Sequence, residues 1–254
     1  MIETEAALLY EAWRTATPVA PPVERDEGLS IADAYAIQRA WIGRREADGA
    51  RRVGRKVGLT SAAMQEMLGV GQPDFGVLLD DMVVSAANRI DSRGLIAPRV
   101  EPEIAFELAA PLEGDVGVDD VLAATARVRG ALEIIDSRVE AWRISIVDTV
   151  ADNASSALVV LGDDSIDVAS IDLAAETVTM TVGAETVEGR GDAVLGQPAA
   201  AVAWLAATLA EHGERLEAGE IILPGAMTRA LPFAAGDTVR CTFGTLGAIE
   251  AAVL

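Results

Sequence analysis

Hydrophobic residues near the start of the chain recur every three to four positions, which is the period of an amphipathic helix. The pattern predicts a helix that begins after Ser30 and ends near Gly49, since Ser30 and Asp33 have the spacing of a capping box. Its apolar positions are Ile31, Ala34, Tyr35, Trp41 and Ile42. A shorter helix precedes it, and the proline-rich stretch 17–28 separates the two.

Strand-like segments predominate from residue 77 onward, after an earlier strand over 51–60. Further strands are predicted over 99–108, 131–139, 176–182, 220–224 and 237–243, and the last of these forms a closing hairpin with the final residues. Helices are predicted over 61–68, over 118–128 and over 198–213, and QPDFG at 72–76 is predicted to be a turn. Because strands and helices do not alternate regularly, the sequence predicts an α+β fold with a curled mixed sheet and surrounding helices.

The composition of the chain argues against some kinds of binding partner. The chain has 254 residues and a net charge of −20, which argues against nucleic acid and anionic membranes because phosphate binding needs clustered cations. The longest apolar run, 199–210, is far shorter than the ~20 residues that span a bilayer, and the acidic amino terminus is unlike a signal peptide. One cysteine, Cys241, excludes an internal disulfide. A cytoplasmic protein without a membrane or nucleic-acid partner is therefore expected.

Lys56 is the only lysine, and the other basic residues of the chain are arginines. A buried lysine can lose its proton, whereas arginine effectively cannot, so one retained lysine indicates a chemical role. Gly54 and Gly58 stand two residues away on the same strand face, which predicts that a flat substrate can approach Lys56 closely. The alternative interpretation is an ordinary lysine at the end of a strand.

Carboxylates gather on the predicted strand over 99–108. Glu101 and Glu103 share a face because side chains two apart in a strand point the same way. Pro102 between them removes a ladder hydrogen bond, so this stretch is expected at a sheet edge or opening. With Glu133 they would suit Mg²⁺ or Mn²⁺, which prefer oxygen ligands. Glu107 also lies on this face, so a solvated row of acids is the alternative.

Histidine and cysteine often act in catalysis, but His212 and Cys241 are not predicted to be catalytic. His212 falls in the last turn of the helix over 198–213, an ordinary place for a cation at a helix end. Cys241 shares a strand face with Val239 and Phe243 and is expected in the core.

Six motifs in one order carry a family resemblance. They are GRKVGLTS (54–61), MLGVGQPDFGVLLDDM (67–82), PRVEPEIAFEL (98–108), ALEIIDSRVEAW (131–142), VDTVADNASSA (147–157) and ILPGAMT (222–228). Over roughly residues 30–254 the chain resembles the 2-keto-4-pentenoate hydratase branch of the fumarylacetoacetate hydrolase superfamily. The resemblance implies a mixed β-roll with surrounding helices, in which a helical segment, 1–70, packs on a β-rich catalytic domain, 71–254, as one structural unit.

The resemblance also implies roles. Glu101, Glu103 and Glu133 match the family's metal ligands, with Mg²⁺ or Mn²⁺ as cofactor, and Lys56 matches its active-site lysine. Asp74 matches an acidic residue of the hydratase branch, at a position that is typically apolar in the related 4-oxalocrotonate decarboxylases. Residues in family motifs that are expected to line the substrate pocket are Ser61, Asn153, Ser155, Ser156 and Thr228.

The implied reaction is hydration of a 2-hydroxy-2,4-dienoate, a small anion, to a 4-hydroxy-2-oxo acid in meta-cleavage degradation of aromatic compounds. A homo-oligomer and a complex with a related decarboxylase are further expectations from the family. Alternatives are a 4-oxalocrotonate decarboxylase, an acylpyruvate-type C–C hydrolase and a non-catalytic partner protein. The hydrolase would need a water-activating histidine or glutamate dyad, and the only histidine, His212, is predicted at the end of an unrelated helix. The protonation state of Lys56 stays open.

Overall fold

The computed structural model describes residues 1–61, 65–66, 69–84 and 89–254. The helices within these ranges are α1 (Ile2–Thr15), α2 (Pro22–Arg25), α3 (Ile31–Ala47), α5 (Val118–Ala124), α6 (Ile146–Ala151) and α7 (Pro198–Glu211). The strands are β1 (Arg52–Gly58), β2 (Asp74–Leu79), β3 (Arg89–Ile90), β4 (Arg99–Leu108), β5 (Thr125–Ile135), β6 (Ser156–Leu161), β7 (Thr177–Val182), β8 (Glu185–Arg190), β9 (Ile221–Leu223), β10 (Leu231–Pro232), β11 (Thr238–Phe243) and β12 (Ala248–Val253).

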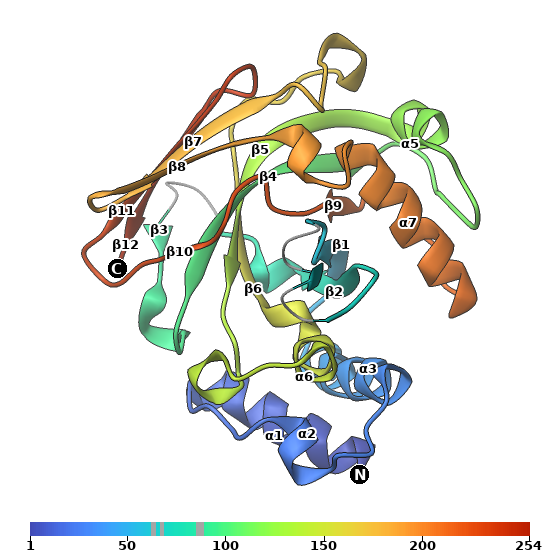
Figure 1. Ribbon diagram of the computed structural model, residues 1–254, viewed down its shortest axis with the longest axis vertical. Helices are drawn as coiled ribbons and strands as arrows, with labels where there is room; N and C mark the ends of the chain where they lie inside the picture. Colours follow the sequence, from blue (N-terminus) through green and yellow to red (C-terminus); the bar gives the residue numbers. More distant parts are fainter. Residues whose placement is uncertain (62–64, 67–68, 85–88) are drawn as a thin grey trace.

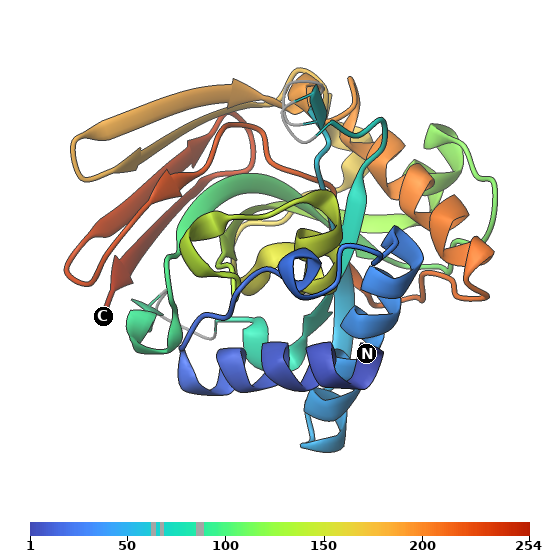
Figure 2. The same ribbon diagram turned by 60° about the horizontal axis from the view of Figure 1, so that its bottom comes forward.

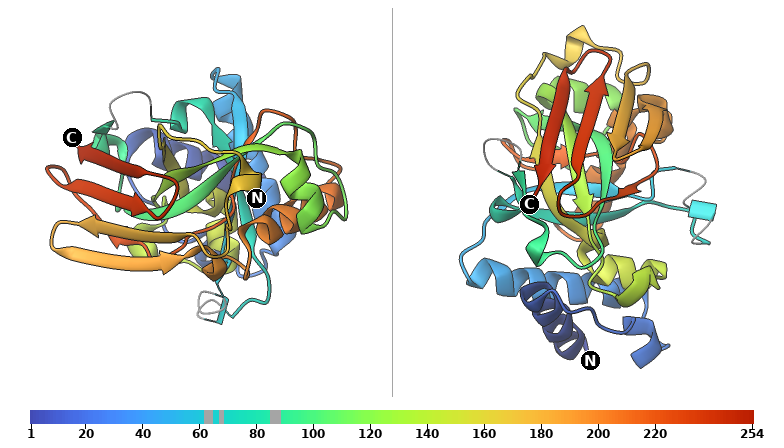
Figure 3. Two further views of the ribbon diagram at one scale, coloured as in Figure 1. Left: turned by 90° about the horizontal axis from the view of Figure 1, so that it is seen from above. Right: turned by 90° about the vertical axis from the view of Figure 1, so that its left-hand side faces the viewer.

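Two mixed sheets form the body of the protein (Figure 1). The larger sheet has the order β2-β1-β9-β4-β5-β6, with β10 also paired to β4, and the smaller has the order β3-β12-β11-β7-β8. β1 runs parallel to β9 and β3 runs parallel to β12, while the other described pairs are antiparallel. The long strands β4 and β5 curl across the molecule, and the left view of Figure 3 shows them from above. The predicted α+β class with a curled mixed sheet is confirmed.

The amino-terminal helices cover one end of the larger sheet. α1, α2, α3 and α6 lie together below the strands, and Figure 2 shows this helical layer from its own side. α3 begins as predicted, because the Ser30 hydroxyl accepts from Asp33 N and the Asp33 carboxylate accepts from Ser30 N at 3.0 Å. Its buried face includes Tyr35, Gln38 and Trp41, which pack toward β2 and α6. Polar atoms on this face have backbone partners: Trp41 Nε1 donates to Ala151 O at 2.9 Å.

The helix predicted over 198–213 corresponds to α7, which starts at Pro198 and ends at Glu211. The stretch Gly191–Glu211 is apolar and long enough to cross a membrane by length and composition alone. In the fold, however, α7 contacts α5 and β1. Its fully buried residues, Val202, Leu205 and Leu209 among them, form part of the hydrophobic core. A buried helix of a globular domain accounts for this composition.

Three element boundaries differ from the predictions. The helix predicted over 118–128 ends at Ala124, because from Thr125 onward the chain pairs with β4, Thr125 opposite Leu108. The strand predicted over 131–139 belongs to β5, which starts at Thr125 and ends at Ile135. Beyond it the ladder stops, since the Asp136 N–H donates to Ser155 O and its carboxylate accepts from two loop amides.

The predicted turn at 72–76 is wrong in its second half. Asp74 begins β2, with Asp74 opposite Gly58 and Phe75 opposite Val57 in an antiparallel ladder with β1. Phe75 also stacks on Tyr35, with 4.5 Å between ring centroids, which favours burying this segment as a strand. The helix predicted over 61–68 lies mostly outside the described residues. The closing hairpin is confirmed as β11 and β12.

The division at residue 70 stays a prediction. β1, in the amino-terminal segment, pairs with β2 on one side and with β9 on the other. The first half of the chain therefore contributes a strand to the larger sheet, and Lys56 is carried on that strand.

Candidate metal centre and active site

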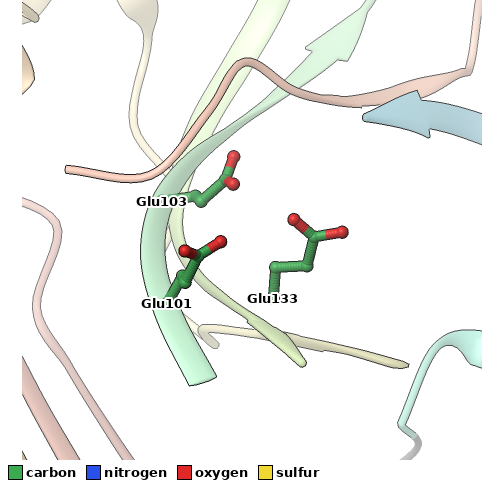
Figure 4. Close-up of side chains that lie close together, drawn as sticks. All are labelled: Glu101, Glu103 and Glu133. Atoms are coloured by element: carbon green, nitrogen blue, oxygen red, sulfur yellow. The ribbon is translucent and has the colours of Figure 1, made fainter. Parts of the chain in front are cut away.

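Strand register places the three glutamates together. In the antiparallel pair of β4 and β5, Glu101 lies opposite Glu133, and Glu103 lies opposite Ala131 on the same face. One oxygen from each carboxylate lies within 4.8 Å of the others. Figure 4 shows the three side chains converging on a common space, two from β4 and one from β5. The predicted sharing of a face by Glu101 and Glu103 is therefore confirmed.

Pro102 explains why this space is open. β4 is an inner strand, so the first alternative of the prediction, a sheet edge, is wrong. On the side away from β5, β4 pairs with β10 at Val100 and with β9 only from Phe106. Between these points a loop replaces a strand: Met227 N donates to Pro102 O at 3.0 Å. The second alternative, an opening in the sheet, is what the structure has.

The same loop contacts a metal-ligand candidate directly. Gly225 N donates to Glu103 Oε2 at 2.8 Å. Gly225 has φ +129°, and a Cβ there would lie 2.2 Å from the Thr60 hydroxyl, so a side chain would be strained and crowded. The glycine of the ILPGAMT motif thus lets the loop pass between Thr60 and Glu103.

Two of the three carboxylates, those of Glu103 and Glu133, are buried far beyond what a solvated acidic row allows, while Glu101 is partly exposed. Glu103 is 1% exposed and Glu133 is 0% exposed. Glu107, the residue that motivated the alternative, is different: it is partly exposed and forms an ion pair with Arg129. The solvated-row interpretation is wrong for Glu103 and Glu133.

Burial and mutual repulsion raise the pKa values of Glu101 and Glu103. Burial and, after it, the Glu133 charge raise the pKa of Glu101 to about 7, although Lys56 opposes both. Burial and Glu133 also raise the pKa of Glu103 well above its ordinary value. Both carboxyls therefore hold protons more strongly than ordinary glutamates when no cation is present.

Lys56 reaches this cluster from β1. Its Nζ donates to Ala154 O at 2.9 Å and lies 3.3 Å from Glu133 Oε2. Lys56 is 4% exposed, and burial by itself would lower its pKa, but the charges of Glu133 and Asp74 outweigh burial and raise it. The surrounding carboxylates therefore favour the protonated form of Lys56.

Asp74 lies near Lys56, on the neighbouring strand β2. A Cβ placed on Gly58 would lie 2.2 Å from Asp74 Oδ1 and 3.4 Å from Lys56 Nζ, so Gly58 leaves room for both groups. Asp74 is 2% exposed, and burial raises its pKa although Lys56 opposes this. Its Oδ1 has no hydrogen-bond partner among the described residues. Asp74 thus presents a free acceptor beside an ammonium.

The glycines flanking Lys56 do not leave the predicted open face. A Cβ on Gly54 would lie 1.9 Å from Ile221 O, so this glycine permits the close approach of β9. Gly58 faces Asp74, as described above. The expectation that both glycines expose Lys56 to a flat substrate is wrong. Gly54 makes room for the neighbouring strand β9, and Gly58 makes room for the Asp74 carboxylate.

The residues present fit a divalent cation. Glu133 has both carboxylate oxygens buried without a hydrogen-bond partner in the described part of the chain, although Lys56 lies nearby. Uncompensated buried carboxylate oxygens are costly, and a hard cation would satisfy them. Three carboxylates with oxygens within 4.8 Å are the donor set that Mg²⁺ and Mn²⁺ prefer.

The predicted substrate-binding residues occupy different surroundings. Ser61 follows Thr60, which lies against Gly225. Ser156 is buried at the start of β6 and lines a separate cavity of about 210 Å³ with Trp13 and Arg138. Thr228 donates to Arg229 O at 2.9 Å, and its methyl group faces Gly189. Their roles in binding stay predictions.

The structure gives Asn153 surroundings other than the expected pocket lining, and it adds Ala154, which the sequence did not single out. Asn153 is 0% exposed, and its side-chain amide bonds Val77 of β2 rather than facing the carboxylates. Ala154 supplies the carbonyl bound by Lys56. A backbone acceptor carries no sequence signal, so only the fold could reveal it. His212 is exposed and lies against Tyr35 and Phe75.

This β-roll, with its buried glutamate cluster beside a lysine–aspartate pair, is that of a known family. The chain belongs to the family described as fumarylacetoacetate (FAA) hydrolase C-terminal, whose model matches residues 52–254. Within it, curated relatives place the chain in the hydratase branch. It is 47% identical to the 2-hydroxyhexa-2,4-dienoate hydratase of Comamonas testosteroni, covering 93% of this chain and 91% of the relative.

Other relatives agree in fold and length. The chain is 42% identical to the 2-keto-4-pentenoate hydratase of Paraburkholderia xenovorans strain LB400, covering 98% of this chain and 93% of the relative. A solved structure of 4-oxalocrotonate decarboxylase from Pseudomonas putida G7, complexed with magnesium and adipate, superposes with a TM-score of 0.96. It is 36% identical and covers 100% of this chain and 97% of that one. The predicted family and fold are confirmed.

Proposed function

We propose that the protein hydrates a 2-hydroxy-2,4-dienoate to a 4-hydroxy-2-oxo acid, as part of meta-cleavage degradation of aromatic compounds. The observation that carries the proposal is the juxtaposition of two reactive groups: a buried three-glutamate cluster and the Lys56–Asp74 pair on adjacent strands. The relatives named as dienoate hydratases support the same reaction.

Glu101, Glu103 and Glu133 are proposed to hold one divalent cation, Mg²⁺ or Mn²⁺. A bound cation of this kind supplies Lewis-acid stabilisation to the oxygens of a 2-oxo acid. The glutamates would hold the cation at the opening of the sheet beside Pro102, next to the Gly225 loop. Such a cation would attract the substrate's anionic end in spite of the protein's net charge of −20.

Lys56 is proposed to act as a donor. Its ammonium is kept protonated by the surrounding carboxylates, so it can donate a hydrogen bond to the substrate carboxylate or a proton during ketonisation of the dienol. A role as a general base would need a lowered pKa, and the carboxylates have the opposite effect. The Ala154 carbonyl and Glu133 hold the ammonium in place.

Asp74 is proposed to orient and deprotonate the water that adds at C4. Its Oδ1 has no protein partner among the described residues, so it can accept from water or from a substrate hydroxyl. Burial raises its pKa toward the range in which a carboxylate accepts a proton more readily at neutral pH.

The test measures loss of the dienoate chromophore. Purified protein with Mg²⁺ should consume 2-hydroxypenta-2,4-dienoate and give a 4-hydroxy-2-oxo acid without releasing CO₂. A chelator should abolish turnover, and added Mg²⁺ or Mn²⁺ should restore it. Unchanged absorbance of the dienoate under these conditions would refute the proposal.

Decarboxylation of 4-oxalocrotonate is the second candidate, because a decarboxylase is among the structures with a matching fold. Asp74 favours the hydratase, since the family resemblance assigns an acid at this position to the hydratase branch. Release of CO₂ from 4-oxalocrotonate with the dienoate left untouched would decide for the decarboxylase.

Further parts of the proposal concern assembly and location. A homo-oligomer, a complex with a related decarboxylase and a cytoplasmic location follow from the family resemblance. Light scattering of the purified chain, alone and mixed with the related decarboxylase, measures the first two. A monomer that stays separate from the decarboxylase would remove both.

A further inference from the structure

We propose that Asn153 is a positioning residue that fixes the Lys56 ammonium through the backbone of the turn it belongs to. The proposal rests on the role given to Lys56 in the proposed function, but it assigns Asn153 a task that a pocket-lining residue would not have. Four observations lead to it.

The turn between α6 and β6 has an unusual backbone. Asn153, Ala154 and Ser155 have φ values of 56°, 50° and 54°, so three consecutive non-glycine residues are left-handed. L-residues rarely adopt this region in succession, because Cβ approaches the following carbonyl oxygen. Such a conformation persists only where the surrounding contacts over-determine it. The turn therefore needs strong external anchors.

Asn153 provides the anchor on the β2 side. Val77 N donates to Asn153 Oδ1 at 2.7 Å, and Asn153 Nδ2 donates to Val77 O at 2.9 Å. β2 is the terminal strand of the larger sheet as described, so the Asn153 amide takes the place that a further strand would fill. Gly76 permits this approach, since a Cβ there would lie 2.5 Å from Asn153 O.

A second anchor holds the other end of the turn. Ser155 O accepts from Asp136 N at 2.8 Å, which ties the turn to the end of β5. Arg138 donates to both the carboxylate and the carbonyl of Asp152, the residue before the turn. With Asn153 clamped to β2 and Ser155 tied to β5, the peptide between them has little freedom.

The carbonyl held between these anchors is that of Ala154, and it accepts from Lys56 Nζ at 2.9 Å. Lys56 of β1 lies opposite Gly76 of β2, and Gly76 is the residue before Val77, which Asn153 binds. The clamp and the lysine are therefore on neighbouring strands. Asn153 sets the position of the carbonyl, and the carbonyl sets the position of the ammonium between Glu133 and Asp74.

The decisive variant is Asn153→Gly. Glycine accepts the left-handed backbone without strain, so this change removes the amide clamp and leaves the turn conformation permitted. We expect kcat for hydration to fall by at least about tenfold, because small misplacements of a catalytic group are costly. KM and Mg²⁺ affinity should stay within about twofold, since the glutamates are untouched.

Gln38→Leu is the matched control. Gln38 is a buried amide that donates to Phe75 O of β2 and to Val150 O of α6, but it does not bind the 153–155 turn. Its loss should lower thermal stability and leave kcat within about twofold. A double-mutant cycle adds a readout that a purely structural role would not move. In a Lys56→Met background, Asn153→Gly should cause no further loss of kcat.

A second readout does not depend on activity. Because Lys56 is the only lysine, protein labelled with ¹³C at lysine Cε gives one lysine resonance. Asn153→Gly should displace this resonance by more than its line width, whereas Gln38→Leu should not. If Asn153→Gly does not fold, Asn153→Asp takes its place, since it keeps the acceptor for Val77 N–H and loses the donor to Val77 O.

The outcomes separate the two proposals. An unmoved lysine resonance in the clamp variant, wild-type kcat, or an equal loss of kcat in both Lys56 backgrounds would overturn the role of Asn153. Wild-type protein that leaves the dienoate untouched would overturn the proposed function instead. The lysine resonance would still decide whether Asn153 positions Lys56.

Discussion

Binding of Mg²⁺ to the glutamate cluster should release protons and weaken as the pH falls. Without a cation the cluster concentrates negative charge in a buried space, with carboxylate oxygens within 4.8 Å of one another. At that separation two like charges repel by about 3.5 kcal/mol at an effective dielectric of about 20. Protons relieve this repulsion in the absence of a cation, and a bound cation must displace them.

The size of the effect follows from Glu101. Burial raises its pKa to about 7, so at pH 8 most Glu101 side chains are ionised and at pH 6 about one in ten is. Displacing this one proton should make the apparent Mg²⁺ affinity about tenfold weaker at pH 6 than at pH 8. Glu103, whose pKa is also raised, adds to the loss in the same direction.

Folding stability has the opposite dependence in the cation-free protein. A carboxyl with a raised pKa binds more protons folded than unfolded in the interval between its ordinary value of 4.5 and about 7. The free energy of unfolding should therefore fall as the pH rises through this interval. Saturating Mg²⁺ should remove that fall, because the bound cation replaces the protons.

Isothermal titration calorimetry measures both quantities. Titrations with Mg²⁺ at pH 6, 7 and 8, each in two buffers of different ionisation enthalpy, give the affinity and the number of protons released. Glu103→Gln is the informative variant, since its amide oxygen can still accept from Gly225 N while the charge is lost. It should fold, bind Mg²⁺ more weakly and release fewer protons.

Glu107→Gln is the matched control on the same strand. Glu107 is ion-paired with Arg129 and lies outside the cluster, so its loss should leave the Mg²⁺ affinity unchanged. The reasoning is refuted if the wild-type affinity is constant between pH 6 and 8 with no buffer dependence. Unchanged binding in Glu103→Gln would remove the cluster as the cation site.

Three further predictions concern the lysine–aspartate pair. Lys56→Arg keeps the charge but should lower kcat by ~10²–10⁴-fold if Lys56 transfers a proton. A change confined to KM would indicate that Lys56 only anchors the substrate carboxylate, and wild-type kinetics would refute both roles. Asp74→Asn should reduce the hydration rate while leaving Mg²⁺ affinity unchanged, and a variant as active as wild type would remove Asp74 from water activation. Gly58→Ala should displace the Asp74 carboxylate, lower kcat and cost about 1–3 kcal/mol by overpacking, whereas Gly43→Ala, where a Cβ meets nothing within 4 Å, should stabilise α3 slightly and keep full activity.

Local pattern was sufficient for much of the fold. The capping box at Ser30 and the start of α7 at Pro198 are set by residues a few positions apart, so the sequence alone locates them. The boundary between α5 and β5 was misplaced because the segment 125–128 fits either period. Only its pairing with β4, which is distant in the sequence, makes it a strand.

The site divides in the same way. Glu101 and Glu103 could be placed on one face from their spacing, Glu133 was added as a third carboxylate in an apolar segment, and the family resemblance supported the grouping. The surroundings of Lys56 could not be predicted, because they come from β2, β5 and the 153–155 turn. The roles of Gly54 and Gly58 were misjudged for this reason: a glycine shows that space is needed, but not which group fills it.

The geometry around Lys56 also gives a physical reason for the single lysine in an arginine-rich chain. Its ammonium donates to the Ala154 carbonyl and lies 3.3 Å from Glu133 Oε2, and the charge of Asp74 also acts on it. An ammonium has three donors that radiate from one atom, which suits acceptors that converge on a point. Arg138, also buried, shows the contrast: its planar guanidinium spreads its donors over the Asp152 carboxylate and two backbone carbonyls. A guanidinium at position 56 would carry its donors past the Ala154 carbonyl and Glu133, toward the space that Gly58 leaves for Asp74. Size and donor geometry, together with the capacity to transfer a proton, therefore distinguish lysine from arginine at this position.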